Sequence, residues 1–311
     1  MRTVDLFAGC GGMSLGFQKA GFEIISAFDN WKEAVACYSS NFDHNIEQID
    51  LADAQVIINK LNNTRIDIII GGPPCQDFSH AGKRTEGSRA DLTDSFAEIV
   101  IGLKPEMYVM ENVDRAQKSK AYKSARKKLA ESGYGITEVI LDASYCGVPQ
   151  KRKRFFSIGK LEQEDNFMLP LIKEMLSERP TTLRDYFGDR LGLEYYYRHP
   201  RNYSRRGIFS IDEPAPTIRG VNRPVPAGYV GHPGDPIPLN DTLRPLTFRE
   251  RAQIQTFPED FVFNGSKTSV EQMIGNAVPV DLAMFVGNAI RKYNTESAKG
   301  KKTKGKEVAT V

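Results

Sequence analysis

The sequence predicts an α/β fold that is built on a mostly parallel sheet, with a second, irregular region inserted before its C-terminal end. Over the first 160 residues, short apolar runs alternate with segments of helical periodicity, as in strands joined by crossover helices. Between residues 177 and 245 this periodicity fades into a stretch rich in Pro, Gly, Tyr and Arg. A helical pattern returns at Ser269 and ends near Tyr293, which predicts a final helix packed on the sheet.

Strands are expected where apolar runs stand between turn residues, and helices where apolar residues recur every three or four positions. Gly21, Gly133 and Gly135 stand where helices are expected to stop. The predicted strands are Thr3–Ala8, Glu23–Phe28, Ile46–Ile49, Ile66–Ile70, Met107–Met110, Ile136–Leu141 and Arg154–Ile158. The predicted helices are Met13–Ala20, Trp31–Ser40, Asp53–Leu61, Leu92–Leu103 and Lys120–Ser132.

The charge pattern divides the chain. The formal net charge is +3, and residues 295–311 hold five lysines against two glutamates, which is the whole excess. This Lys/Gly-rich tail is expected to be disordered. Between Glu174 and Ser266 there are twelve arginines and no lysine. Because guanidinium groups bind phosphates and guanine edges in pairs of bonds, this region favours contact with DNA or RNA. Arginine–carboxylate pairs on an ordinary surface are the alternative.

Composition argues against several classes of protein. No run of 18 or more apolar residues occurs, so no membrane span or membrane partner is expected. The four cysteines form no C-x-x-C pair and the four histidines are scattered, so no metal site is expected. These features favour a reduced, cytosolic compartment.

One cysteine stands on a stiff turn. Cys75 follows Gly71-Gly72-Pro73-Pro74, directly after the apolar run 66–70. The carboxyl edge of a parallel sheet is where ligands bind, and the prolines restrict the turn, so Cys75 should be presented there. A nucleophilic thiol and a buried structural cysteine are both compatible with this spacing.

A second set of residues outlines an adenosine site. The glycine-rich turn Phe7-Ala8-Gly9-Cys10-Gly11-Gly12 follows the first strand and opens a helix, so backbone N–H groups can approach a ligand. Asp29 ends the second apolar run, where a carboxylate can accept from both ribose hydroxyls. Asp50 follows the third run and could accept from an adenine amino group, although a helix cap is the alternative. The spacing is not that of a dinucleotide site.

Six segments in order resemble the motifs of the DNA cytosine-C5 methyltransferases, and together they span nearly the whole chain. Asp5–Gly12 resembles motif I, Gly72–Gln76 the nucleophile motif IV, and Glu111-Asn112-Val113 motif VI. Gln150–Arg154 resembles motif VIII, Arg244–Thr247 with Arg249-Glu250 motif IX, and Gly275–Pro279 motif X. The family aromatic next to the ribose-binding acid is replaced here by Asn30, so the adenine could stack on Trp31 or Phe7.

The resemblance implies a Rossmann-like sheet that binds S-adenosylmethionine, with a smaller target-recognition domain inserted. We expect a discontinuous catalytic domain (1–160 plus 268–294), a recognition domain (161–267) and a basic tail (295–311). The implied cofactor-binding residues are Phe7, Gly9, Gly11, Gly12, Asp29, Asn30, Asp50, Leu51, Pro73, Leu92, Asn276 and Ala277.

The resemblance also assigns the chemistry. Cys75 would attack C6 of cytosine, and Glu111, protonated because burial raises its pKa, would donate to N3. Asn112 would orient the Pro-Cys loop, Arg154 would hold O2, and Arg152 would support a phosphate or Glu111. The cytosine must be flipped out of the duplex, and the segment Gln76–Asp91 would close over it as a lid. The expected DNA contacts are Ser79, Lys83, Arg84, Arg89, Arg205, Arg206, Thr217, Arg219 and Arg223.

The family resemblance therefore predicts a monomeric bacterial DNA cytosine-5 methyltransferase of a restriction–modification system, acting in the cytosol or nucleoid on double-stranded DNA. A cognate restriction endonuclease would act independently. The recognition region resembles that of methylases which modify GTCGAC-type sites. The alternatives are a tRNA cytosine-C5 methyltransferase and a catalytically silent DNA-binding homologue.

Overall fold

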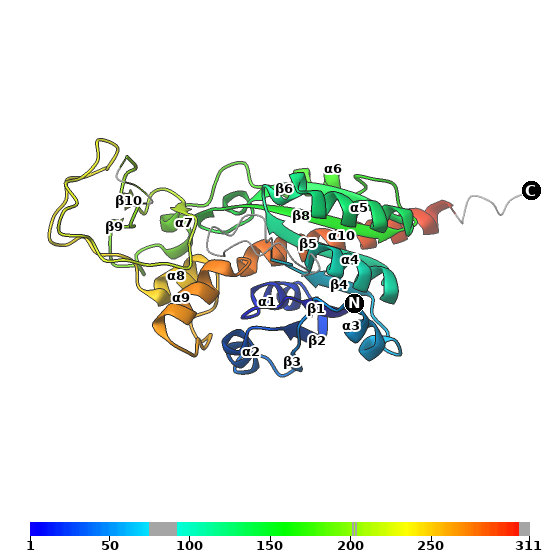
Figure 1. Cartoon of the computed structure of the whole chain (residues 1–311). Coiled ribbons are helices and arrows are strands. Elements are labelled where there is room, and N and C mark those ends of the chain that lie inside the picture. Colours follow the sequence, from blue (N-terminus) through cyan, green and yellow to red (C-terminus); the bar gives the residue numbers. More distant parts are fainter. Residues whose placement is uncertain (75–91, 201, 203, 305–311) are drawn as a thin grey trace, which may run out of the picture.

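The computed structural model describes residues 1–74, 92–200, 202 and 204–304. Its centre is a seven-stranded sheet in which the strand order is β3-β2-β1-β4-β5-β8-β6. The predicted α/β class with a mostly parallel sheet is confirmed (Figure 1). The strands are β1 (Arg2–Leu6), β2 (Glu23–Asp29), β3 (Ile46–Gln48), β4 (Ile68–Gly71), β5 (Met107–Val113), β6 (Tyr134–Asp142) and β8 (Lys153–Leu161).

One strand runs against the others. The pairs among β3, β2, β1, β4 and β5 are parallel, whereas β8 is antiparallel to both β5 and β6. The register places Glu111 opposite Phe156 and Val113 opposite Arg154. Pairing with β8 extends β5 three residues past the predicted end at Met110, so Glu111 and Asn112 lie within the strand. The reversed strand thereby brings Arg154 to the end of the sheet where Glu111 lies.

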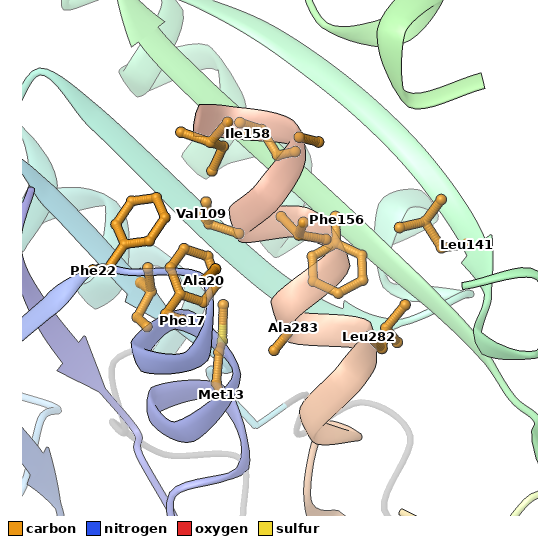
Figure 2. Packing of buried hydrophobic residues seen from close by; sticks show 14 of the residues in the cluster. Met13, Phe17, Ala20, Phe22, Val109, Leu141, Phe156, Ile158, Leu282 and Ala283 are labelled. Atoms are coloured by element: carbon orange, nitrogen blue, oxygen red, sulfur yellow. The ribbon is translucent and has the colours of Figure 1, made fainter. Parts of the chain in front are cut away.

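Helices α1 (Gly12–Lys19), α6 (Leu169–Met175) and α10 (Val280–Lys304) cover one face of the sheet. Figure 2 shows Phe17 of α1 and Leu282 of α10 packed against Val109, Phe156 and other strand residues. Helices α1 and α10 approach closely at Gly16. A Cβ there would lie 2.3 Å from the Val280 carbonyl oxygen, so a larger residue would not fit. Helix α6 packs in this layer, although it lies within the region 161–267 that the sequence predicts as a separate domain.

The opposite face carries helices α3 (Ala54–Leu61), α4 (Leu92–Leu103) and α5 (Lys120–Glu131). Along β4, Ile68 and Ile70 face the first layer while Ile69 faces the second. This alternation explains why the strand is a continuous apolar run, since both of its faces are buried. Helix α2 (Lys32–Ser39) packs beside β2 and β3 at the edge of the sheet.

The inserted region has little regular structure and lies at one end of the molecule (Figure 1). It contains α7 (Leu183–Phe187), the antiparallel pair β9 (Tyr195–Tyr197) and β10 (Ile208–Ser210), and β11 (Ala215–Pro216). Strand β11 pairs with β7 (Gln150–Lys151), which directly precedes β8. The apolar residues of the inserted region belong to the same cluster as residues of α8 (Phe248–Ile254) and α9 (Lys267–Asn276) and Cys10 of the glycine turn. The inserted region therefore packs against the glycine turn.

The C-terminal helical segment differs from the prediction in two ways. It is divided into α9 and α10 by a turn, because Pro279 lacks an N–H and keeps the preceding residue out of the helical conformation. Helix α10 then continues to Lys304, where a disordered tail was predicted from Thr295, because extending an existing helix is easier than starting one. By length and composition, residues 267–297 include an 18-residue stretch that could span a membrane, but 67 % of that stretch is buried, as in a core helix.

Candidate active site

A cavity of about 570 Å³ opens at the carboxyl ends of the parallel strands. The ends of β1, β2 and β5 and the segments that follow β1, β2 and β4 meet there with the turn between α9 and α10. Open parallel sheets bind their ligands at this edge. The cavity is lined by Asp5, Phe7, Ala8, Gly9, Cys10, Gly12, Met13, Asp29, Asn30, Trp31, Gly72, Pro73, Pro74, Leu92, Glu111, Asn112, Val113, Arg154, Met273, Gly275, Asn276, Ala277 and Val278.

Asp29 ties two of these segments together. Its carboxylate accepts hydrogen bonds from the Gly9 and Trp31 backbone N–H groups, each at 2.8 Å. Burial raises the pKa of Asp29 from its ordinary value, and these two bonds oppose the shift. A Cβ on Gly9 would meet no atom of the described residues within 4 Å. The backbone of the turn after β1 therefore borders the cavity, and the adenosine site stays a prediction.

Asp5 is a second carboxylate in the cavity wall, and the sequence analysis assigned it no role. It is fully buried, and its Oδ2 accepts a hydrogen bond from the Ser14 hydroxyl at 2.6 Å. Its Oδ1 is buried without a partner among the described residues. Burial raises the pKa of Asp5 to about 7. A charged residue between Val4 and Leu6 in a buried strand is the signal that could have revealed it.

Glu111 and Arg154 form an ion pair in the wall of the cavity. Arg154 Nε donates to Glu111 Oε1 at 2.9 Å, and both side chains are largely buried. Burial raises the pKa of Glu111 from its ordinary value, while the charges of Arg154 and Arg152 oppose the shift. A Cβ on Gly72 would lie 3.0 Å from Glu111 Oε2, so the glycine leaves room for the acid. The site can therefore present a carboxyl group that keeps its proton to a higher pH than an exposed glutamic acid does.

Asn112 connects this pair to the loop that carries the cysteine. Its side-chain amide donates to the Pro73 carbonyl oxygen at 2.8 Å, and its own carbonyl accepts from the Val113 N–H at 2.8 Å. Both Pro73 and Pro74 line the cavity. Cys75 itself, the predicted lid 76–91 and the predicted DNA contacts Ser79, Lys83, Arg84 and Arg89 lie outside the described residues.

Arg152 is placed differently from the prediction. It is 1 % exposed and does not border the cavity; its guanidinium donates to the carbonyl oxygens of Ile218, Gly275 and Ala277 at 3.0, 2.9 and 3.0 Å. A group buried in this way cannot contact a DNA phosphate, so that predicted role is wrong. The charge of Arg152 opposes the rise in the pKa of Glu111, and its support of Glu111 stays a prediction. Strand β7 ends at Lys151, and the Arg152 side chain that follows it lies in the protein interior.

Three predicted cofactor residues do not border the cavity. Gly11 has a φ of 97°, and a Cβ there would lie 2.3 Å from the Phe42 ring, so it serves the turn and its packing. Asp50 is exposed, and its Oδ1 accepts from the Ala52 N–H at 3.0 Å within a turn, whereas the N-cap of α3 is Asp53. Leu51 is buried in the core between α3 and α4. Asp50 and Leu51 follow the end of β3 at Gln48, and this early end leaves both residues away from the cavity.

The predicted DNA contacts of the inserted region fall into two groups. Arg205 and Arg223 are exposed. Arg206 forms an ion pair with Glu213 and lies over the Phe209 ring, Thr217 donates to the Lys151 carbonyl oxygen, and Arg219 donates to the His199 carbonyl oxygen. Arg219 and Arg223 border a small cavity with Tyr196, Tyr197 and other residues. The structure thus gives Arg206, Thr217 and Arg219 positions fixed by contacts within the protein.

The comparisons with known proteins agree with this geometry. A family model described as C-5 cytosine-specific DNA methylase matches residues 1–292. The chain is 56 % identical over 298 residues to the type II methyltransferase M.HindV of Haemophilus influenzae, covering 95 % of this chain and 98 % of that protein. It is 53 % identical over 294 residues to M.HgiDI of Herpetosiphon aurantiacus, covering 94 % and 95 %. A crystal structure of a putative DNA modification methyltransferase from an E. coli prophage has the same fold, with a TM-score of 0.68 at 24 % identity over 95 % and 99 % of the chains.

Proposed function

The chain belongs to the C-5 cytosine-specific DNA methylases and is a DNA cytosine-5 methyltransferase, and from this premise we propose how its residues carry out the reaction. The observation that supports the proposal is the juxtaposition of two features in one cavity. The glycine turn and Asp29 stand on one wall, and the Glu111–Arg154 pair stands on another. A methyl donor and a target base can therefore meet in the same space.

The cofactor implied by the family is S-adenosylmethionine, and the residues of the cavity fit it. The turn residues Phe7 and Gly9, with Asp29, would hold the adenosine, and Phe7 or Trp31 would stack on the adenine. The buried and unpartnered Oδ1 of Asp5 suits a donor on the methionine part, because a buried acceptor needs a hydrogen bond. The remaining proposed contacts are Gly12, Asn30, Pro73, Leu92, Asn276 and Ala277. When bound, the cofactor supplies an electrophilic methyl group.

Cys75 is proposed as the nucleophile. Its thiolate would add to C6 of cytosine, forming a C–S bond and moving the ring electrons toward N3 and O2, so that C5 becomes nucleophilic. After C5 takes up the methyl group, a base removes the C5 proton, the C–S bond breaks, and the thiolate leaves. The Asn112 amide, which holds the Pro73 carbonyl oxygen, would fix the loop from which Cys75 extends.

Glu111 and Arg154 are proposed to stabilise the attacked ring. Protonated Glu111 would donate to N3 as negative charge develops there, and Arg154 would donate to O2. The raised pKa of Glu111 supports the first role, because a carboxyl group must keep its proton to donate it. The Arg154 side chain is 15 % exposed, so a guanidinium lies at the cavity wall with little competition from water.

The substrate is proposed to be double-stranded DNA with the cytosine flipped out of the stack, since C6 cannot be reached inside a duplex. The inserted region would recognise the sequence, with Arg205 and Arg223 free to contact phosphates or bases. The relatives named as type II methyltransferases support a role in restriction–modification in the bacterial cytosol, with a separate endonuclease. We further propose a monomer whose catalytic domain combines residues 1–160 and helix α6 with residues 268–294.

The test combines trapping with sequencing. In the presence of cofactor, a duplex that carries 5-fluorocytosine at the target should form a covalent adduct with the wild-type protein, because fluorine cannot leave as a proton does. Cys75→Ser should form no adduct and methylate no DNA while keeping the wild-type circular dichroism. Bisulfite sequencing of DNA from expressing cells identifies the target site. Full turnover by Cys75→Ser, or methylation of tRNA in preference to DNA, would contradict the proposal.

A further inference from the structure

A buried polar junction joins the inserted region to the cavity. It consists of Gln150, Arg152 and Gln255, of which each is at most 1 % exposed. The Gln150 side chain accepts from the Ile218 N–H at 2.8 Å and donates to Gln255 Oε1 at 2.6 Å. The Gln255 amide donates to the carbonyl oxygens of Ile274 and Ala277 at 2.6 and 3.1 Å. The junction therefore reaches the inserted region on one side and the end of α9 on the other.

Arg152 is the member of this junction that contacts both sides directly. Nη1 donates to the Ile218 carbonyl oxygen, and Nη2 donates to those of Gly275 and Ala277. Gly275 and Ala277 line the cavity. Ile218 lies between Thr217 and Arg219, two of the DNA contacts predicted from the sequence. A planar guanidinium has five donors in a fixed fork, so it holds its three acceptors in one relative position.

Two close approaches tighten the same arrangement. A Cβ on Gly275 would lie 2.2 Å from the Gly220 backbone nitrogen, so α9 touches the segment 217–220 backbone to backbone. A Cβ on Gly12 would lie 2.3 Å from the Val278 carbonyl oxygen, so the turn after α9 touches the glycine turn in the same way. A displacement of segment 217–220 would therefore be transmitted to the cavity wall, because close-packed backbone cannot absorb it.

We propose that Arg152 is a positioning residue that sets the DNA-recognition segment 217–220 and the cavity-lining turn 275–278 in one arrangement. Binding of the cofactor and binding of DNA then both depend on a side chain that touches neither ligand. This inference rests on the proposed function, because it takes the cavity as the cofactor site and segment 217–220 as part of the DNA contact.

The experiment compares Arg152→Gln with three other variants in binary titrations. Binding of S-adenosylhomocysteine is measured by calorimetry without DNA, and binding of the duplex identified by bisulfite sequencing is measured without cofactor. We expect Arg152→Gln to weaken both affinities at least about tenfold, since it loses hydrogen bonds made by a charged donor. It should also lower the preference for the cognate duplex over one with a single base-pair change.

The other variants separate positioning from chemistry and from simple stability. Arg154→Gln should lower kcat and leave S-adenosylhomocysteine binding within about twofold of wild type. Arg184→Gln removes ion pairs to Glu194 and Asp212 inside the inserted region and should change neither affinity. Arg152→Lys keeps the charge but not the fork, and should fall between wild type and Arg152→Gln. If Arg152→Gln does not fold, Arg152→Lys carries the test.

The contrary results are distinct from one another. The positioning role would be overturned if folded Arg152→Gln, measured well below its Tm, bound both ligands with wild-type affinity. If the glutamine variant does not fold, wild-type affinities of Arg152→Lys would overturn it. A loss of kcat alone would also overturn it, because that would make Arg152 part of the chemistry. If the wild-type protein bound neither S-adenosylhomocysteine nor the duplex, the proposed function itself would fail instead.

Discussion

Replacement of Glu111 by glutamine tests the proposed acid most directly. The amide has nearly the same shape and can still accept from Arg154 Nε, which lies 2.9 Å from Glu111 Oε1, so the cavity should keep its form. It cannot donate an acidic proton to N3. Proton transfer by a placed group typically contributes about 10²–10⁴-fold, and kcat should fall by that factor. This corresponds to about 3 to 5 kcal/mol of activation free energy.

The same substitution predicts two pH dependences. Burial raises the pKa of Glu111 in the folded protein, so the active, protonated form is lost as the pH rises through that raised value. Wild-type kcat should therefore fall on the alkaline side, and this limb should be absent from Glu111→Gln. Because the folded protein holds this proton more tightly than the unfolded chain, the protonated acid contributes to the free energy of unfolding. This contribution is complete below the ordinary pKa of the acid and is lost as the pH rises through the raised pKa. The Tm of the variant relative to wild type should therefore increase with pH.

The assay is transfer of tritiated methyl groups to duplex DNA over a range of pH, with thermal unfolding recorded in the same buffers. Glu138→Gln is the matched control, because Glu138 is also a strand glutamate paired with an arginine, at 3.1 Å from Arg126, but lies away from the cavity. It should leave kcat unchanged. A kcat for Glu111→Gln within about threefold of wild type, or an alkaline limb that persists in the variant, would refute the acid role.

Three further substitutions test the cavity, the core and the recognition region. Gly12→Ala places a Cβ 2.3 Å from the Val278 carbonyl oxygen and should weaken S-adenosylhomocysteine binding at least about tenfold in calorimetry. Gly228→Ala, whose Cβ meets nothing within 4 Å, is its control, and equal affinities would count against the placement. Phe156→Ala, at a fully buried position, should lower the free energy of unfolding in urea by about 3–5 kcal/mol. Ile140→Ala, at a position 41 % exposed, should cost less than about 1 kcal/mol, and similar losses would contradict the assigned core. Arg205→Ala should weaken DNA binding and reduce the slope of log affinity against log salt by about 1, whereas an unchanged slope would exclude a phosphate contact.

The order of the helices and strands in the sheet domain could be predicted from the sequence alone. Each of the five helices predicted before residue 160 begins and ends within one residue of its observed bounds, because apolar periodicity and the stopping glycines are local signals. The apolar run 66–70 likewise predicted a strand, which the structure contains as β4. The cavity residues Gly9, Asp29 and Glu111 could be predicted because they follow or end such strands, and parallel strands share one carboxyl edge.

The burial and the contacts of individual side chains could be read only from the tertiary structure. Arg152 and Arg154 are two positions apart in one basic run, yet one is enclosed and the other lines the cavity. The partners of Arg152 are 66, 123 and 125 residues away along the chain, so no local pattern could reveal its role. Asp50 matched a binding position in spacing, but the early end of β3 left it in a solvent-exposed turn. Burial and pairing depend on contacts distant in sequence, and only these contacts distinguish the enclosed arginine from the one that lines the cavity.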